Sequence, residues 1–171
     1  MTAAPLVELT LETDAFARDW SHCDQIANYL GQLVAHDRPD SFLYANLLST
    51  VLNELFEAVF ARHHAHGAVR CTLARNGRHD RVELLIPADA AVRAFYKESV
   101  AAAQAGDVAE AYTRALLGKE SPAGLLGMLE LAADYGAQLS VEESASGEEI
   151  HFILQVTLED GGLPANQDNG L

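Results

Sequence analysis

The sequence has few of the features that mark secreted or membrane-spanning proteins. Two cysteines, Cys23 and Cys71, do not make a disulfide framework in a chain of 171 residues, which favours a reducing compartment. The first residues, MTAAPLVELTLETD, lack the basic region and long apolar core of a signal peptide. No apolar run approaches the length of a membrane span. We therefore expect a cytoplasmic protein.

Basic residues are also scarce. The chain carries 11 Lys and Arg against 25 Asp and Glu, which gives a net charge of -14 and a pI near 4.7. A field of this sign repels phosphate backbones and anionic lipids, so neither nucleic acid nor a membrane surface is expected as a partner. A protein partner with a basic face is expected instead. The simpler alternative is that the charge only keeps the protein soluble.

What the sequence does contain is typical of one globular domain. Apolar residues make up 49% of the chain and charged residues 21%. We expect a single domain over residues 1–160, followed by a flexible tail over residues 161–171, which read GGLPANQDNGL.

The hydrophobic patterns predict strands and helices in an order that indicates an α+β fold. Asn76-Gly77 between two apolar runs predicts a hairpin, and Gly67 and Gly136 are expected to end helices. The expected strands are 6–13, 68–75, 81–87, 137–143 and 149–158. The expected helices are 20–35, a long helix that includes 47–66, then 90–104, 108–117 and 121–135. The long helix is expected to begin at a cap at Asp40 or Ser41, and the last helix to open at Ser121-Pro122 and end at Tyr135. This order predicts a two-layer sandwich, with a mixed β-sheet covered by helices on one face.

The long helix carries the most informative motif. Glu54, Ala58 and Arg62 are four residues apart and lie in one row. The sequence NELFEAV over residues 53–59 resembles the Asn-Glu-Leu-Leu-Glu-Asn-Ala motif of the GHKL (histidine-kinase-like) ATPase superfamily at six of seven positions. In that family the Glu polarises the nucleophile and the second Asn binds Mg²⁺. Here Ala58 replaces the metal ligand, and a methyl group cannot bind a cation that requires oxygen.

Two further motifs of this family are present in altered form. After Ile86 the chain reads PADAA, so Asp89 stands at the position that reads adenine, but the two family glycines are missing. The sequence SPAGLLG over residues 121–127 partly matches the Gly-rich turn that leads into a phosphate-binding helix, with Gly124 and Gly127 in place. The resemblance covers about residues 6–158 and is greatest to the anti-sigma-type and SiaB-like branch of bacterial regulators.

The resemblance implies a function in bacterial signal transduction. A vestigial nucleotide pocket would consist of Asn53, Glu57, Asp89, Gly124 and Gly127. The first interpretation is a degenerate regulatory protein of the anti-sigma or partner-switching type, which acts by protein–protein interaction and needs no cofactor. The second is an active ATP-dependent serine/threonine kinase, with Glu54 as the catalytic base and Mg²⁺ held by other ligands, of which Glu57 is the nearest candidate. A third is a docking or phosphotransfer module that has kept only the fold.

Each candidate residue also has a simpler interpretation. Glu54 can be an exposed helix acid paired with Arg62 or Lys119. The guanidinium of Arg62 can in turn fill the space of a nucleotide phosphate. The histidines at positions 63, 64 and 66 stand at a helix end, where the helix dipole favours imidazolium without a ligand, so no metal site is expected. The partner, the pathway and the choice between monomer and homodimer stay open.

Overall fold

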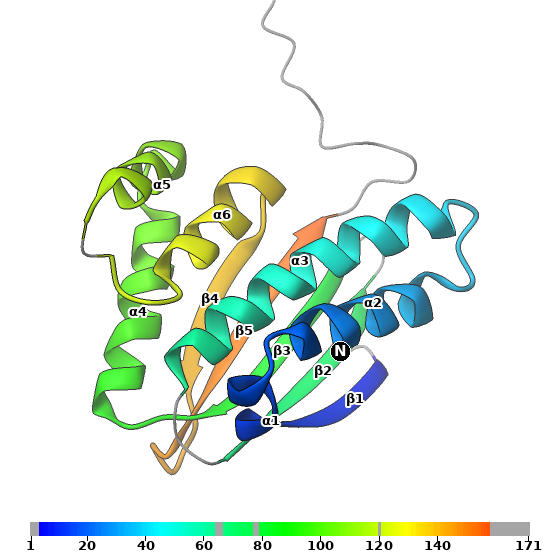
Figure 1. The fold of residues 1–171 in the computed structure, drawn as a ribbon, viewed down its shortest axis with the longest axis horizontal. Helices are drawn as coiled ribbons and strands as arrows, with labels where there is room; N and C mark the ends of the chain where they lie inside the picture. Colours follow the sequence, from blue (N-terminus) through cyan, green and yellow to red (C-terminus); the bar gives the residue numbers. More distant parts are fainter. Residues whose placement is uncertain (1–3, 64–66, 77–78, 120, 158–171) are drawn as a thin grey trace, which may run out of the picture.

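The computed structural model describes residues 4–63, 67–76, 79–119 and 121–157. One sheet forms the back layer, and helices lie across one of its faces (Figure 1). The predicted tail lies outside the described residues. The elements are β1 (Pro5–Glu12), α1 (Thr13–Arg18), α2 (Ser21–Ala35), α3 (Ser41–Arg62), β2 (Ala68–Asn76), β3 (His79–Pro87), α4 (Ala90–Gln104), α5 (Val108–Leu117), α6 (Leu125–Tyr135), β4 (Gln138–Glu143) and β5 (Glu149–Thr157).

The five strands lie in the order β1-β2-β3-β5-β4. The predicted two-layer α+β arrangement is confirmed. The expectation of a mixed sheet is wrong, because every described pair of neighbouring strands is antiparallel. Two of these pairs are hairpins, but β1 with β2 and β3 with β5 are joined through long helical connections, which allow either direction. The order of the elements therefore could not decide the direction of these pairs.

Alternation along the strands separates an apolar face of the sheet from a polar one. In β3, Val82, Leu84 and Ile86 are buried, and the residues between them are partly exposed. On the partly exposed face, Glu83 accepts hydrogen bonds from Arg81 at 3.2 Å and from the ring of His151 at 3.0 Å. The apolar face packs against the helices, as expected of an antiparallel sheet with one face in water.

The boundaries of the helices differ from the prediction in three places. Helix α1 has six residues and was not predicted, because one and a half turns give too little periodicity. Helix α3 ends at Arg62 and not at Gly67, since His63 already adopts an extended conformation. Helix α6 begins after Gly124, whose φ of 88° places it in the left-handed region, so the Ser121-Pro122 pair precedes the helix and does not open it.

Helices α2 and α3 pack at unusually close range. A Cβ atom added to Gly31 would lie 2.2 Å from the Ser49 hydroxyl oxygen and 2.7 Å from the Ala45 carbonyl oxygen. Only a glycine allows the two backbones to approach this closely. Cys23 on α2 and Cys71 on β2 are both fully buried, and burial raises the pKa of each thiol to about 12.

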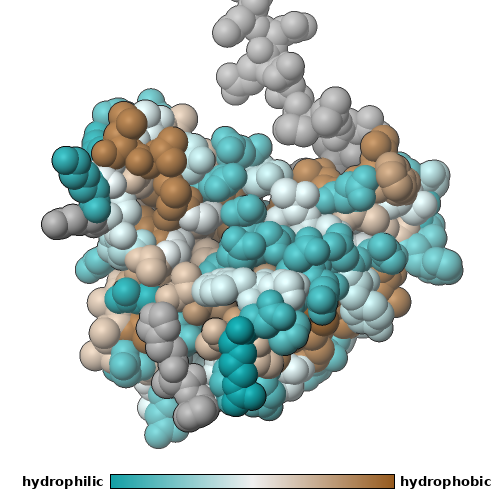
Figure 2. Space-filling model, in the orientation of Figure 1, coloured by the Kyte–Doolittle hydropathy of each residue, from teal (hydrophilic) through white to brown (hydrophobic). Residues whose placement is uncertain are grey.

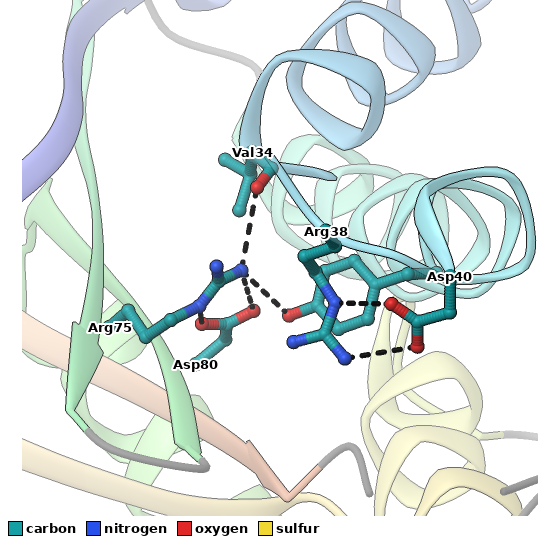
Figure 3. A network of polar contacts seen from close by, with 6 residues as sticks. Val34, Arg38, Asp40, Arg75 and Asp80 are labelled. Atoms are coloured by element: carbon teal, nitrogen blue, oxygen red, sulfur yellow. Dashed lines mark hydrogen bonds and ion pairs between the residues drawn. The ribbon is translucent and has the colours of Figure 1, made fainter. Parts of the chain in front are cut away.

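A partly buried arginine joins the α2–α3 pair to the β2–β3 hairpin (Figure 3). Arg75 donates hydrogen bonds to both carboxylate oxygens of Asp80, at 2.8 and 3.1 Å. The same guanidinium reaches the Val34 carbonyl oxygen at the end of α2 and the Tyr44 hydroxyl on α3, each at 3.4 Å. Burial raises the pKa of Asp80 to about 6, so its carboxylate is ionised at neutral pH and can hold Arg75.

A second ion pair closes the loop between α2 and α3 (Figure 3). Arg38 donates to the two carboxylate oxygens of Asp40 at 2.8 and 3.0 Å. Its guanidinium carbon lies 3.9 Å from the centre of the Tyr44 ring, which adds a cation–π contact. The two helices are therefore fixed to each other and to the sheet at one end.

No helix among the described residues is both long enough and apolar enough to cross a membrane.

Candidate functional site

The structure places five of the predicted site residues on two neighbouring helices. Asn53 and Glu57 lie on α3 with Glu54 between them, and Gly124 and Gly127 lie at the start of α6. Helices α3 and α6 run side by side over the sheet (Figure 1). The sequence motifs therefore meet in space, although about 70 residues separate them.

The contact between these helices is centred on Ala58. Its side chain is only 4% exposed. A Cβ added to Gly127 would lie 3.1 Å from the Ala58 Cβ, and one added to Gly124 would lie 2.4 Å from the Ala58 carbonyl oxygen. The position that resembles the family's metal ligand is thus inside a helix–helix contact that leaves no room for a larger side chain.

Four acidic side chains surround this contact. Partial burial raises the pKa of Glu54, and the negative charges of Glu130 and Glu57 raise it further. The pKa of Glu130 is raised by burial first and then by Asp134 and Glu57. These acids come from α3 and α6 and interact unfavourably when ionised, so we call them the acidic cluster.

The predicted ion pair of Glu54 with Arg62 or Lys119 is not found among the described residues. Arg62 instead lies over the ring of Phe95 on α4, with 4.8 Å between the guanidinium carbon and the ring centre. Gly124 is close to the same ring, since a Cβ there would lie 3.3 Å from its Cζ. Phe95 is therefore a residue that sequence reasoning missed and that joins Arg62 to the start of α6.

Only one of the two polar atoms of the Asn53 side chain has a hydrogen-bond partner among the described residues. Its amide nitrogen donates to the Glu57 carboxylate at 2.9 Å. Its Oδ1 atom is buried and has no hydrogen-bond partner among the described residues. The i, i+4 spacing of the two residues explains the bond that is made.

Asp89 lies elsewhere. It is the N-cap of α4, and its carboxylate accepts a hydrogen bond from the Val92 amide at 2.8 Å. It lines an open cavity of about 630 Å³ together with Arg62 and His63, at the carboxyl end of α3. Eight residues separate Glu54 from Arg62, so about 12 Å of helix lies between the acidic cluster and this cavity. None of the other predicted site residues is among the described residues that line it.

Arg93 is a second residue of this cavity that sequence reasoning missed. It donates to the carbonyl oxygen of Ala88 at 2.8 Å and to that of Gly147 in the β4–β5 turn. It thereby holds the turn against the start of α4. Its position four residues after Asp89 gave no separate signal in the sequence.

The histidine group gives no metal site in the part of the chain that is described. The Nε2 atom of His63 lies 3.4 Å from the hydroxyl of the fully buried Tyr96. His64 and His66 lie outside the described residues. Among those that are described, no three His, Cys, Asp or Glu side chains are arranged to hold a metal ion.

Comparison with known proteins supports the fold. No protein-family model matches the chain, and no curated protein matches it. A chain in the crystal structure of the SiaB–SiaC complex from Pseudomonas aeruginosa has a similar fold, with a TM-score of 0.55 and 18% sequence identity. The match covers 85% of the present chain and 94% of that chain. The likeness extends over nearly the whole fold and not over a shared motif alone.

Proposed function

We propose that this protein is a regulatory component of bacterial signal transduction that acts by protein–protein interaction, of the anti-sigma or partner-switching type, without efficient ATP hydrolysis. The motif resemblance to the GHKL superfamily and the fold likeness to a chain of a two-protein complex support this role. The single observation that carries it is the contact of Ala58 with Gly124 and Gly127.

This contact argues against nucleotide chemistry in two ways. Mg²⁺ is held by oxygen ligands in near-ideal octahedral geometry, and Ala58 offers only a methyl group. The start of α6 also rests directly on α3, so a phosphate group between them requires the helices to separate. Asp89, which resembles the adenine-reading residue, is already engaged as the cap of α4.

The surface charge supports a protein partner with a basic face. The net charge of -14 gives long-range attraction to such a partner, and the acidic cluster adds a local negative surface. The attraction acts mainly on the rate of encounter, which salt reduces.

Calorimetric titration with ATP and Mg²⁺ tests the absence of nucleotide chemistry. We expect no binding tighter than about 1 mM, a free energy of about -4 kcal/mol. A titration with Mg²⁺ alone and one with ATP and excess chelator serve as controls for nonspecific heats. Binding in the micromolar range would contradict the proposal.

One observation favours a second candidate, an active ATP-dependent serine/threonine kinase. Burial and the neighbouring acids Glu130 and Glu57 raise the pKa of Glu54, which is the direction in which the pKa of a general base is tuned. If this candidate is correct, Glu54→Gln abolishes phosphotransfer to the partner and keeps ATP binding. Glu110→Gln, which changes an exposed acid on α5, is the matched control and should leave phosphotransfer unchanged.

The partner itself is identified by capture with the intact protein, followed by association rates at two salt concentrations. We expect the rate to fall several-fold between roughly 0.05 and 0.5 M salt, because the Debye length shrinks to a few ångströms. An association rate that does not depend on salt would leave solubility as the sufficient explanation of the charge. Capture of nucleic acid alone would contradict the charge argument.

A further inference from the structure

Two neighbouring helices contain long stretches without any charged residue. Residues 25–36 on α2 and residues 41–53 on α3 include no Asp, Glu, Lys or Arg. Charged residues make up 21% of the chain, so about five would be expected in these 25 positions. The two stretches pack against each other where Gly31 of α2 lies against Ala45 and Ser49 of α3.

Burial does not explain this absence, because many of these positions are exposed. Exposed helix positions normally carry charged or polar groups, and this protein has 25 acidic residues to place there. We call the ten exposed positions the charge-free face: Gln25, Asn28, Tyr29, Gln32, Leu33, His36, Phe42, Leu43, Asn46 and Thr50.

The charge-free face combines amides with exposed apolar side chains. Phe42 is 75% exposed, Leu43 68%, Tyr29 59% and Leu33 46%. In the space-filling view hydrophilic residues predominate over the middle of α2 and α3 (Figure 2). A surface poor in charge and containing aromatic residues has the composition of the centre of a protein–protein interface.

We propose that the charge-free face binds a second copy of this chain, so that two α2–α3 pairs pack across a two-fold axis. The protomers each carry a charge of -14, and contact through charged surfaces brings acids against acids. A surface without charges removes this local repulsion. A basic partner, in contrast, is best matched by a surface that carries acids.

The amides of this face suit a symmetric contact. Gln25, Gln32 and Asn46 each carry a hydrogen-bond donor and an acceptor on one side chain. Around a two-fold axis the same surface must complement itself, which amides can do and carboxylates cannot. The exposed rings and leucines supply the apolar area, and two helix pairs stacked face to face give a contact like that of a four-helix bundle.

The helix pair is also fixed before it associates. Gly31 allows close packing of α2 on α3, and Arg75 joins both helices to the sheet. Little ordering of the backbone is then required on binding, which favours affinity. Acidic residues border both charge-free stretches: Asp24 and Asp37 stand at the ends of the first, and Asp40 and Glu54 at the ends of the second.

Salt distinguishes this contact from association with a basic partner. Screening weakens the residual repulsion between two acidic protomers, so the dimer should tighten or stay unchanged as salt rises. Association with a basic partner weakens under the same change. The two interactions are thus separable in one buffer series.

Sedimentation equilibrium of the full chain tests the proposal. Protein concentrations up to about 0.5 mM detect a dimer with a dissociation constant of about 0.5 mM or lower. We expect the mass of a dimer. The double variant Gln32→Glu with Asn46→Asp is nearly isosteric and should weaken dimerisation at least tenfold at low salt. The control is Gln138→Glu with Ala145→Glu, which adds the same charge at exposed positions of β4 and its turn and should leave dimerisation unchanged.

Three results would overturn the proposal. One is a monomer over the whole concentration range; another is a dimer that both double variants weaken equally. The third is a monomer in which the double variant of the charge-free face abolishes binding of a different protein, which would assign the face to that partner. Circular dichroism of each variant establishes that it is folded, so none of these results reduces to loss of structure.

Discussion

On both flanks of α3 a glycine of a neighbouring element allows close packing, but the surfaces of the two flanks differ. On one flank Gly31 of α2 lies against Ala45 and Ser49, and on the other Gly124 and Gly127 of the α6 region lie against Ala58. The first flank is free of charge over 25 residues and is joined to the sheet by Arg75. The second carries the acidic cluster and is the place where two of the three nucleotide motifs of the resemblance meet.

The difference teaches that close packing and surface chemistry are set independently along one helix. Glycine on a neighbouring element brings two backbones together wherever the core requires it. The exposed and partly exposed positions of α3 are then free to carry no charge over residues 41–53 and carboxylates at Glu54 and Glu57 further along the helix. One helix can therefore separate a surface suited to self-association from one suited to a basic partner.

The largest expected effect is on the α2 flank. Gly31→Val should lower the free energy of unfolding by about 3 kcal/mol or more, because the added atoms overlap the Ala45 backbone, which cannot move without bending α3. Urea denaturation measures the change. Ala101→Val, at an exposed position of α4, controls for the lower helix propensity of valine. A loss of less than about 1 kcal/mol would show that the two helices are not this close.

Arg75→Met should lower the free energy of unfolding by about 3 kcal/mol at neutral pH, because it leaves the buried Asp80 carboxylate without its partner. The double variant with Asp80→Asn should recover part of this loss. A double-mutant cycle from denaturation curves measures the coupling between the two side chains. Additive effects in that cycle would mean that the pair does not hold the α2 flank to the sheet.

On the α6 flank, Ala58→Asn restores the residue of the family motif and should still give no ATP turnover. It should also lower the free energy of unfolding by about 2 kcal/mol, since the larger side chain must displace the start of α6. A coupled ATPase assay and thermal melting check the two parts. Turnover by this single variant would show that a nucleotide pocket is intact and that the missing glycines after Ile86 matter less than we infer.

The smallest expected effect concerns pH. Because burial raises the pKa of Asp80 to about 6, its folded form binds a proton more readily than its unfolded form. The stability that it contributes is therefore fully present below about pH 4 and is lost as the pH rises through about 6. Relative to Asp80→Asn, the wild type should lose on the order of 1 to 2 kcal/mol between pH 4 and pH 7. A constant difference would mean that Arg75 fully offsets the effect of burial.

Most of the helices and strands could be predicted because the residues that begin and end them act locally. The helices at 90–104 and 108–117 and the end of α6 at Gly136 are confirmed, since caps and glycines act within one turn. The direction of the β1–β2 and β3–β5 pairs depends on contacts between distant residues, and the pattern within each strand does not contain it.

The candidate site was predictable only in part. The motifs named Glu54 and Gly127 as parts of one pocket, and the structure places the start of α6 beside the Glu54 turn of α3, but the role of these residues stays a prediction. Asp89 also had a local alternative in the sequence, as an acid directly before a helix is a common N-cap. The closeness of Gly127 to Ala58 could not be predicted, because it depends on the tertiary contact of two helices. Whether any nucleotide binds stays a prediction.

The two buried thiols can report when the parts of the structure that enclose them open to solvent. Cys23 reports on α2 and Cys71 on strand β2 of the sheet, and with pKa values of about 12 neither thiol reacts while it is enclosed. Alkylation of each residue can occur only during the intervals in which its segment is detached. The two labelling rates, read separately by peptide mass, therefore compare local detachment of the helix pair with opening of the whole domain.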